Sequence, residues 1–191
     1  MRLVDQLARH AVADTAEAED LARIRRFVEE HTDPFDRGIP EGHLTGSAVV
    51  VTASGDKVLL LHHRKLDRWL QPGGHASPGE SEGEQVALRE AREETGLEGL
   101  RLHPTAPRPL DVDVHDIPER RDEPAHEHLD LRYLVVSPDH AQPDRDHVET
   151  NDCRWFGWKE LGALDLDAGL RRALAKAHRL VRGEASRDAS D

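Results

Sequence analysis

The chain has 191 residues and a formal net charge of −12, from 38 acidic and 26 basic residues. Broad affinity for nucleic acids depends on Lys and Arg neutralising phosphates, so this balance argues against it. The single cysteine, Cys153, excludes an intrachain disulfide, and we interpret it as buried and inert. No apolar run approaches the ~18 residues of a membrane span, and the first residues lack the apolar core of a signal peptide. We therefore expect a cytoplasmic protein with one well-cored domain.

Residues 1–42 are predicted to form a helical extension and a linker. Apolar side chains recur at helical spacing at Val4 and Leu7, and again at Leu21 and Ile24 after a second helix start near Asp14. The stretch HTDPFDRGIPEGH then breaks the pattern with two prolines and two glycines. We expect these helices to cover a substrate pocket or to form the interface of a homodimer.

The centre of the chain alternates short strands with helices. SAVVVT and KVLLLHH, separated by ASGD, predict a hairpin, and PLDVDVHDI alternates as a half-buried strand does. Further strands are predicted at HLDLRYLVV and CRWFGW, and a helix over residues 166–180. Hairpins mixed with helices favour one α/β sandwich over a regular βαβ array. The domain should span residues 43–182, with a disordered tail at 183–191.

The stretch ALREAREETGLEGL carries three acids where a helix least favours them. Glu90, Glu93 and Glu94 fall at i, i+3 and i+4, so they share a face and repel by a few tenths of a kcal/mol per pair. Glu93 and Glu94 also lie in the last turn, at the negative end of the helix just before Gly96, at a cost of roughly 0.3–1 kcal/mol each. A solvated face of an acidic protein is one explanation. A site that holds cations is the one we favour.

The start of this helix has a recognisable pattern. Ser81 and Glu84 match the S-x-x-E capping box, which predicts a helix that Ser81 caps. One side of the predicted helix is mostly small or apolar and suits packing on a sheet. Arg89 lies four residues before Glu93 and could restrain its carboxylate.

A glycine-containing loop precedes the helix. In WLQPGGHASPGE, Gly73 and Gly74 let a backbone carbonyl approach a metal or ligand without an intervening Cβ. Mg²⁺ prefers oxygen ligands and binds through a few carboxylates together with substrate phosphates. Arg64 and Arg68, upstream of the loop, could contact such a phosphate, or could belong to a solvated strand end.

Residues 74–97, GHASPGESEGEQVALREAREETGL, resemble the Nudix box, commonly written G-x5-E-x7-R-E-U-x-E-E-x-G-U with U a bulky aliphatic residue. The resemblance extends over roughly residues 44–165. Two departures are that Ala91 fills an aliphatic position and that eight residues, not seven, separate Glu80 from Arg89. The extra residue falls between loop and helix, so we expect Glu80 to be free of Arg89 or only loosely paired with it.

The resemblance implies a Nudix-type α/β/α sandwich with a mixed sheet, and a pyrophosphohydrolase acting on acid anhydrides. Its substrate would be a small molecule, a nucleoside diphosphate linked to another moiety or a related phosphorylated compound. The cofactor would be Mg²⁺ or Mn²⁺, and the ligands would be Gly74 and the three helix acids. Glu90 or Glu93 would accept the proton of the attacking water. Gly73 would contact substrate and Arg89 would orient the acids.

Further acids and histidines leave open questions. Members of this family often use one more acid from elsewhere, and Glu123, Glu127 and Glu149 are the candidates. His126, His128 and Asp130 share one face of a strand and could form a metal triad. Substrate contacts, or ordinary surface histidines, are the other interpretations of this face.

Two smaller questions concern the aromatic residues and the class of function. Trp69, Trp155 and Trp158 could stack on a base, although core packing is expected for at least two. A Nudix-fold sensor that binds a nucleotide without turnover is the alternative to an enzyme.

Overall fold

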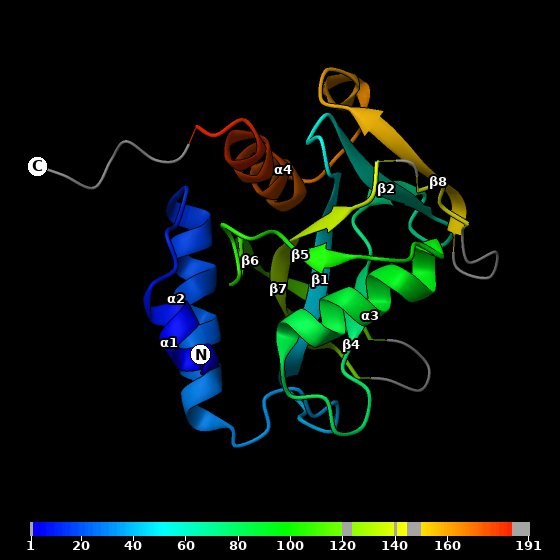
Figure 1. Cartoon of the computed structure of the whole chain (residues 1–191). Coiled ribbons are helices and arrows are strands. Elements are labelled where there is room, and N and C mark those ends of the chain that lie inside the picture. Colours follow the sequence, from blue (N-terminus) through cyan, green and yellow to red (C-terminus); the bar gives the residue numbers. More distant parts are fainter. Residues whose placement is uncertain (1, 120–123, 140, 145–149, 185–191) are drawn as a thin grey trace, which may run out of the picture.

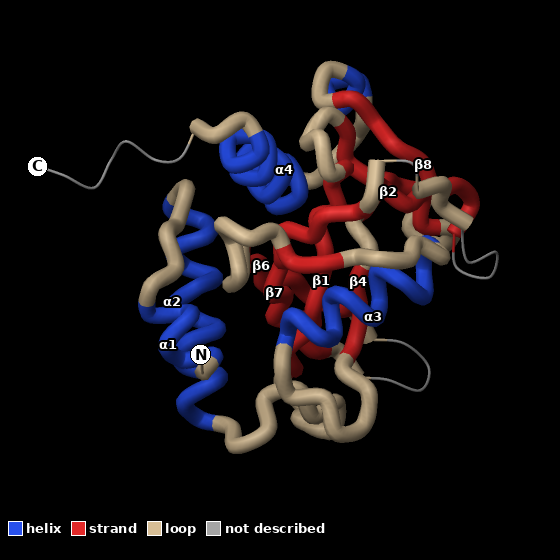
Figure 2. Tube along the Cα trace, viewed as in Figure 1, coloured by secondary structure: helices blue, strands red, loops and turns tan. Residues whose placement is uncertain are grey.

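One long strand, β1 (Gly42–Thr52), organises the fold. It pairs in parallel with β7 (His126–Ser137) and antiparallel with β2 (Lys57–His63) and β4 (Gly73–His75). This combination of parallel and antiparallel pairs confirms the predicted mixed sheet. The computed structural model describes residues 2–119, 124–139, 141–144 and 150–184 (Figures 1 and 2).

The remaining strands extend the sheet on both sides of β1. β3 (Arg68–Leu70) and β8 (Thr150–Gly157) pair with β2, while β5 (Arg101–Leu102) and β6 (Asp111–Ile117) pair with β7. The predicted strands are all present, including the strand end before the glycine loop at β3, but β4 and β5 were not foreseen. Each has three residues or fewer, which is too short to show a period of two.

Helices cover both faces of the sheet (Figures 1 and 2). α1 (Leu3–Ala8), α2 (Thr15–Glu30) and α3 (Gly83–Thr95) contribute to one core, and α4 (Ala168–Val181) to the other. Along β1, Ala48 and Val50 enter the first core while Val49 and Val51 enter the second. Because both faces are buried, residues 48–51 of this strand form a continuous apolar run. A short 3₁₀ helix, η1 (Glu160–Ala163), follows β8.

The N-terminal helices pack directly on the sheet. Ile24 and Phe27 of α2 are fully buried in the first core. The second helix start is confirmed, because the Asp14 side chain accepts a hydrogen bond from the Glu17 backbone N–H at 2.8 Å. The division of the chain near residue 42 into an extension and a domain stays a prediction. Of the predicted tail, residues 185–191 lie outside the described part of the chain.

Helix α3 lies close against β1 because a glycine faces it. A Cβ added at Gly46 would lie 2.7 Å from the Gly83 carbonyl oxygen and 2.8 Å from the Val86 Cβ. Val86, Ala87 and Ala91 are fully buried at this contact. The sheet therefore fixes the position of α3, and with it the acids at the C-terminal end of the helix.

The predicted capping box is wrong. The helix begins at Gly83 after the N-cap residue Glu82, and no side chain caps it. The extra residue lengthens the loop, so Ser81 is exposed and lies one position outside the N-cap. At the other end the prediction is confirmed: Gly96 has φ 63° and donates its N–H to the Arg92 carbonyl at 2.8 Å.

Charged side chains are buried where α2 and α4 meet β6 and β7. We call this set the buried charge network, and its members are Glu17, Asp111, Asp113, Asp130, Arg132, Arg172 and Lys176. Asp111 is fully buried. It accepts hydrogen bonds from Arg172 Nε at 2.8 Å and from Arg132 Nη1 at 3.3 Å. The polar face of the predicted half-buried strand is therefore covered at Asp111. Paired charges can be buried in this way, whereas isolated ones would cost several kcal/mol.

No helix in the described ranges combines the length and the apolarity needed to cross a membrane.

Candidate metal and substrate site on helix α3

Glu90, Glu93 and Glu94 lie along the C-terminal half of α3, and we call them the carboxylate ridge. Their exposure differs: 16% of the Glu90 side chain is exposed to solvent against 60% for Glu93. Glu94 Oε2 accepts a hydrogen bond from the Gly73 N–H at 2.9 Å. The ridge therefore runs from a sheltered acid to an open one, beside strand β4.

Arg89 connects the ridge to the loop before the helix. Its Nη1 lies 2.8 Å from Glu90 Oε1 and 2.9 Å from Glu93 Oε2, so the predicted contact with Glu93 is confirmed. Its Nη2 donates to the His75 carbonyl oxygen at 2.7 Å. One guanidinium thus fixes two of the three ridge carboxylates relative to β4.

Glu80 is firmly paired, against the expectation from the longer spacing. Arg89 donates three hydrogen bonds of 2.9–3.1 Å to its carboxylate, and these bonds lower the pKa of Glu80. A tight turn absorbs the extra residue: Ser77 N–H donates to Glu80 Oε2 at 2.8 Å, and Glu80 N–H to the Ser77 carbonyl at 2.9 Å. This turn returns the carboxylate to Arg89.

Neighbouring side chains leave no room for a Cβ at either glycine of β4. A Cβ at Gly73 would lie 2.2 Å from Ser47 Oγ, and one at Gly74 would lie 2.7 Å from the Glu90 carboxyl carbon. Only glycine allows the backbone this close to both groups. The main chain of β4 therefore lies directly against the ridge, as the glycine pair predicted.

The charges of the site are unbalanced. Three acids, Glu80, Glu90 and Glu93, share one guanidinium, that of Arg89. Burial raises the pKa of Glu90 although Arg89 opposes this, and the neighbouring Glu93 and Glu80 raise it further. A hard divalent cation would relieve the repulsion, and carboxylate and carbonyl oxygens are the ligands it prefers. The donor set and the cradle at Gly74 fit such an ion.

The structure places the other predicted residues as follows. Arg64 and Arg68 are both exposed, and Arg64 Nε donates to Asn151 Oδ1 at 3.2 Å. Glu127 forms an ion pair with Arg23 of α2 at 2.7 Å. Glu123 and Glu149 lie outside the described residues. Their roles as substrate contacts or as an extra acid stay predictions.

The predicted triad of His126, His128 and Asp130 does not converge. Asp130 belongs to the buried charge network, and it accepts from Thr45 Oγ1 at 2.9 Å and from Ser47 Oγ at 2.8 Å. His126 is 9% exposed, so an ordinary surface histidine is also the wrong interpretation there.

His128 instead meets histidines from two other strands, His43 and His75. The Nε2 atoms of His75 and His128 are 3.1 Å apart. Burial and the surrounding imidazoles lower the pKa of His128 to about 2, so it is neutral. Sequence reasoning missed His43 and His75, because only the pairing of strands brings them together.

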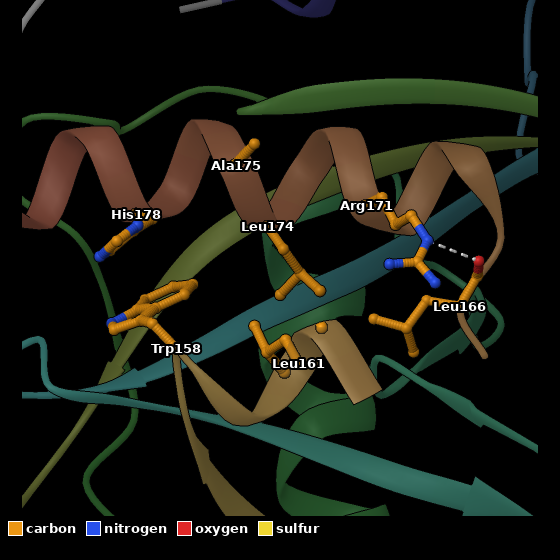
Figure 3. Close-up of a pocket in the computed structure, with 8 residues that line it drawn as sticks. Trp158, Leu161, Leu166, Arg171, Leu174, Ala175 and His178 are labelled. Carbon is orange, nitrogen blue, oxygen red and sulfur yellow. Dashed lines mark hydrogen bonds between the residues drawn. The ribbon is translucent and has the colours of Figure 1, made fainter. Parts of the chain in front are cut away.

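A hollow of about 240 Å³ lies between η1 and α4, away from the ridge (Figure 3). Leu161, Leu174 and His178 line it, together with Trp158, whose ring stacks on His178 at 4.5 Å. No ridge residue lines this hollow. It therefore does not contribute to the carboxylate site.

The tryptophans pack against the cores, which confirms the expectation for them. Trp69 and Trp158 pack against the second core and Trp155 against the first. Cys153 is half-buried rather than buried, because it lies on strand β8 at the side of the sheet.

A second hollow, of about 500 Å³, lies beside the loop that carries Glu80. It is lined from one side by Gly79, Glu80 and Ser81 and from the other by the N-terminal region, including Val4 and Val28. The N-terminal helices therefore border the loop before α3.

The fold and the ridge together define a class: an α/β/α sandwich with a cluster of carboxylates beside a glycine-containing strand. The chain belongs to the Nudix family, since the model of the NUDIX domain matches residues 42–177. A Bacillus subtilis (strain 168) protein named "Putative 8-oxo-dGTP diphosphatase" is 31% identical over 110 residues, which are 58% of this chain and 64% of that protein. The match thus covers slightly less than two thirds of that relative.

Solved structures share the fold. A NUDIX-family hydrolase from Clostridium perfringens aligns with a TM-score of 0.59 at 24% identity, covering 72% of this chain and 97% of that one. A C. elegans Ap4A hydrolase in a binary complex aligns with a TM-score of 0.57 at 21% identity, covering 73% of this chain and 98% of that one. The NUDIX domain of Shewanella oneidensis NrtR, complexed with ADP ribose, aligns with a TM-score of 0.56 at 16% identity, covering 82% of this chain and 97% of that one.

Proposed function

We propose that the protein is a Nudix pyrophosphohydrolase that uses Mg²⁺ or Mn²⁺. The observation that carries this is the carboxylate ridge, in which Glu90 and Glu93 share the Arg89 guanidinium with Glu80, and Glu94 accepts the Gly73 N–H of β4. Glu90, Glu93, Glu94 and the Gly74 carbonyl would hold the ions. When bound, the ions would polarise the diphosphate oxygens and lower the pKa of an attacking water.

The residues of the chain then have separate tasks. Arg89 holds Glu90 and Glu93 in fixed orientations, and the Gly73 N–H does the same for Glu94. Glu90 is the sheltered acid with the raised pKa, so it suits the acceptance of a proton from water better than an exposed carboxylate would. Glu93, on the open side of the ridge, is the second candidate for that role.

The substrate class is a nucleoside diphosphate linked to another moiety, or a related small phosphorylated compound. The support comes from family membership and from relatives whose names refer to 8-oxo-dGTP, Ap4A and ADP ribose. The exposed Arg64 and Arg68 would contact its phosphates. A homodimer, with the N-terminal helices at its interface, belongs to the same proposal.

A panel of nucleotide sugars, dinucleoside polyphosphates, (d)NTPs and ADP-ribose, incubated with Mg²⁺, tests the proposal. We expect turnover of at least one compound, and loss of Mn²⁺ affinity by calorimetry in Glu94→Gln. Glu98→Gln is the matched control, because Glu98 is an exposed acid just beyond the end of α3. Tight, metal-dependent binding of one compound without turnover of any would instead identify a sensor.

A further inference from the structure

Histidines from four strands gather on one side of the sheet. The pairing places His43 of β1 opposite His128 of β7, and His128 opposite His115 of β6. His75 of β4 lies opposite Thr45, two residues along β1 from His43 and so on the same face. His126 stacks on His43, with ring centroids 5.1 Å apart. Strand register alone therefore assembles a cluster of imidazoles.

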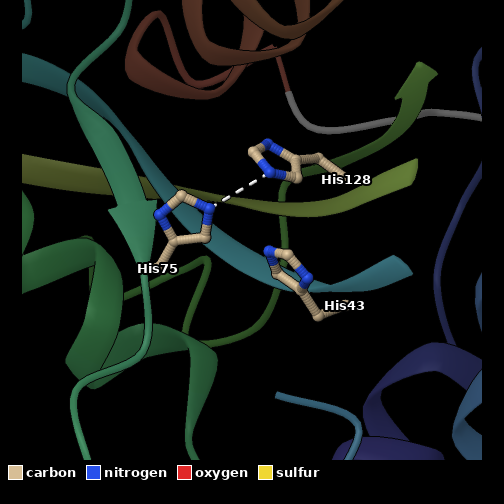
Figure 4. Close-up of side chains that lie close together, drawn as sticks. All are labelled: His43, His75 and His128. Atoms are coloured by element: carbon tan, nitrogen blue, oxygen red, sulfur yellow. Dashed lines mark hydrogen bonds between the residues drawn. The ribbon is translucent and has the colours of Figure 1, made fainter. Parts of the chain in front are cut away.

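Three of these imidazoles converge. His43, His75 and His128 point toward one another from three strands (Figure 4), and each offers one ring nitrogen within 4.8 Å of the other two. The Nε2 atoms of His75 and His128 are 3.1 Å apart. Tetrahedral zinc with Zn–N bonds of about 2.0–2.1 Å holds its ligand nitrogens about 3.4 Å apart. The pair already has nearly this spacing.

We propose that His43, His75 and His128 bind a divalent transition-metal ion, with Zn²⁺ the best match, at a site distinct from the carboxylate ridge. Neutral imidazole nitrogens suit Zn²⁺, Ni²⁺ or Cu²⁺, whereas Mg²⁺ prefers oxygen. Three protein ligands leave a fourth position for water or for an oxygen of a bound molecule. The two sites thus select different ions by the chemistry of their donors.

The surroundings of the cluster provide both rigidity and access. His43 is 1% exposed, so packing fixes its ring, while His75 and His128 are half-buried and leave a route for an ion. The sheet places Asp130 next to His128 in the strand, and Thr45, Ser47 and Arg132 hold its carboxylate.

Strand β4 is common to both sites. The His75 side chain belongs to the cluster, while its carbonyl oxygen accepts from Arg89 Nη2 at 2.7 Å. On the opposite face of the same strand, the Cα of Gly74 lies against the Glu90 carboxylate. An ion bound to His75 would therefore also fix the strand that supports the ridge.

Calorimetric titration of chelator-treated protein with Zn²⁺, in excess Mg²⁺, tests the site. We expect one Zn²⁺ per chain, and a loss of affinity of at least about 100-fold in His75→Ala and in His128→Asn, because a direct ligand should matter more than an outer-shell one. Co²⁺ in place of Zn²⁺ should give the visible absorption of a four-coordinate ion, and the same variants should abolish it.

Controls separate this site from both its neighbours and the ridge. His115→Ala removes an imidazole of the same cluster, 5.5 Å from His128 between ring centroids, and should cost clearly less Zn²⁺ affinity than His75→Ala does. Glu93→Gln should also keep it, whether or not the protein hydrolyses any diphosphate. Far-UV circular dichroism confirms folding, and His43→Gln provides a third variant if His128→Asn does not fold. Unchanged Zn²⁺ affinity in folded His75→Ala, or equal losses in His115→Ala, would overturn the proposal.

Discussion

The carboxylate ridge and the buried charge network are built from the same kinds of side chain but are balanced differently. In the network, three cations lie among four carboxylates, with Asp14 and Asp20 also within 3.8 Å of Arg172, and Asp111 and Glu17 are fully buried. At the ridge, the Arg89 guanidinium alone is shared by Glu90, Glu93 and the loop residue Glu80, and Glu93 is 60% exposed.

This contrast shows that charge balance, rather than the number of acids, separates a structural cluster from a functional one. Matched charges can be buried and hold two helices to a sheet. Acids that outnumber their cations near the C-terminal end of a helix cost stability, and the cationic ligand that we propose for the ridge would offset this cost. The following predictions break or sharpen this contrast, starting from the largest effect.

Glu90→Gln should lower kcat by at least ~100-fold, the low end of the contribution of a general base. Substrate binding should change less, because Glu93 and Glu94 remain to hold a cation. Steady-state kinetics on the substrate found by the panel measure this, with Glu98→Gln as the control. Near-normal turnover in Glu90→Gln would indicate that Glu93, rather than Glu90, accepts the proton of the water.

Glu17→Gln should reduce the free energy of unfolding by about 3 kcal/mol at pH 7, since it leaves the buried Lys176 with Asp111, at 3.5 Å, in place of its nearer carboxylate partner. Burial opposes ionisation of Glu17, but hydrogen bonds from His10, Lys176 and the Ala13 N–H lower its pKa to about 2. The stabilisation is therefore present above pH ~4.5 and is lost as pH falls toward 2.

Urea unfolding of Glu17→Gln and the wild type between pH 2 and pH 7 checks this. The two proteins should converge at the acid end. A constant difference across this range would contradict the assigned pKa.

Asp20→Asn should increase stability, by about 1–2 kcal/mol at pH 7–8. Burial and the neighbouring Asp113 raise the pKa of Asp20 to about 6, although Arg172 lowers it. Asp20 should contribute most to the stability of the folded wild type below pH ~3.8, where it is protonated. This contribution should be lost as pH rises through 6. Thermal unfolding across that range should show the slope in the wild type, and a much flatter curve in the variant.

Glu93→Gln should leave stability without metal unchanged or raise it by a few tenths of a kcal/mol. It removes the exposed ion pair with Arg89, which contributes little, and it relieves repulsion along the ridge. The same variant should bind Mn²⁺ more weakly in calorimetry. Clear destabilisation would show that the ridge acid has a structural role.

Ser81→Ala should have the smallest effect, within about 0.3 kcal/mol. Loss of an N-cap would cost about 1 kcal/mol, but Ser81 is exposed and lies outside the helix that begins at Gly83. A melting temperature equal to that of the wild type is the expected result. A loss of stability near 1 kcal/mol would show that Ser81 does cap the helix.

The features that local spacing determines were predictable. The ridge follows from the period of a helix, and the end of helix α3 follows from Gly96. The long strands follow from apolar runs bounded by turns. The roles of the loop were harder to foresee, because one additional residue moved the helix start while a turn at Ser77 restored the pairing of Glu80.

Features that depend on contacts between distant strands were not predictable. His43, His75 and His128 lie far apart in the chain, and only the pairing of β1 with β4 and β7 brings them together. Asp111 alternates with apolar residues as a solvent-facing side chain would, yet α4 covers it and supplies Arg172. A single sequence does not show which helix will cover which strand.

The contact between Glu17 and Lys176 joins residues 159 positions apart in the chain. During synthesis, α2 is complete long before the cation that pairs with its acid has been made. Until α4 docks, Glu17 and Asp111 lack one of their buried partners, so this corner of the molecule cannot reach its native packing early. Such distant pairing slows folding, and we expect the docking of α4 to be a late step in which the two ends of the described chain are brought together.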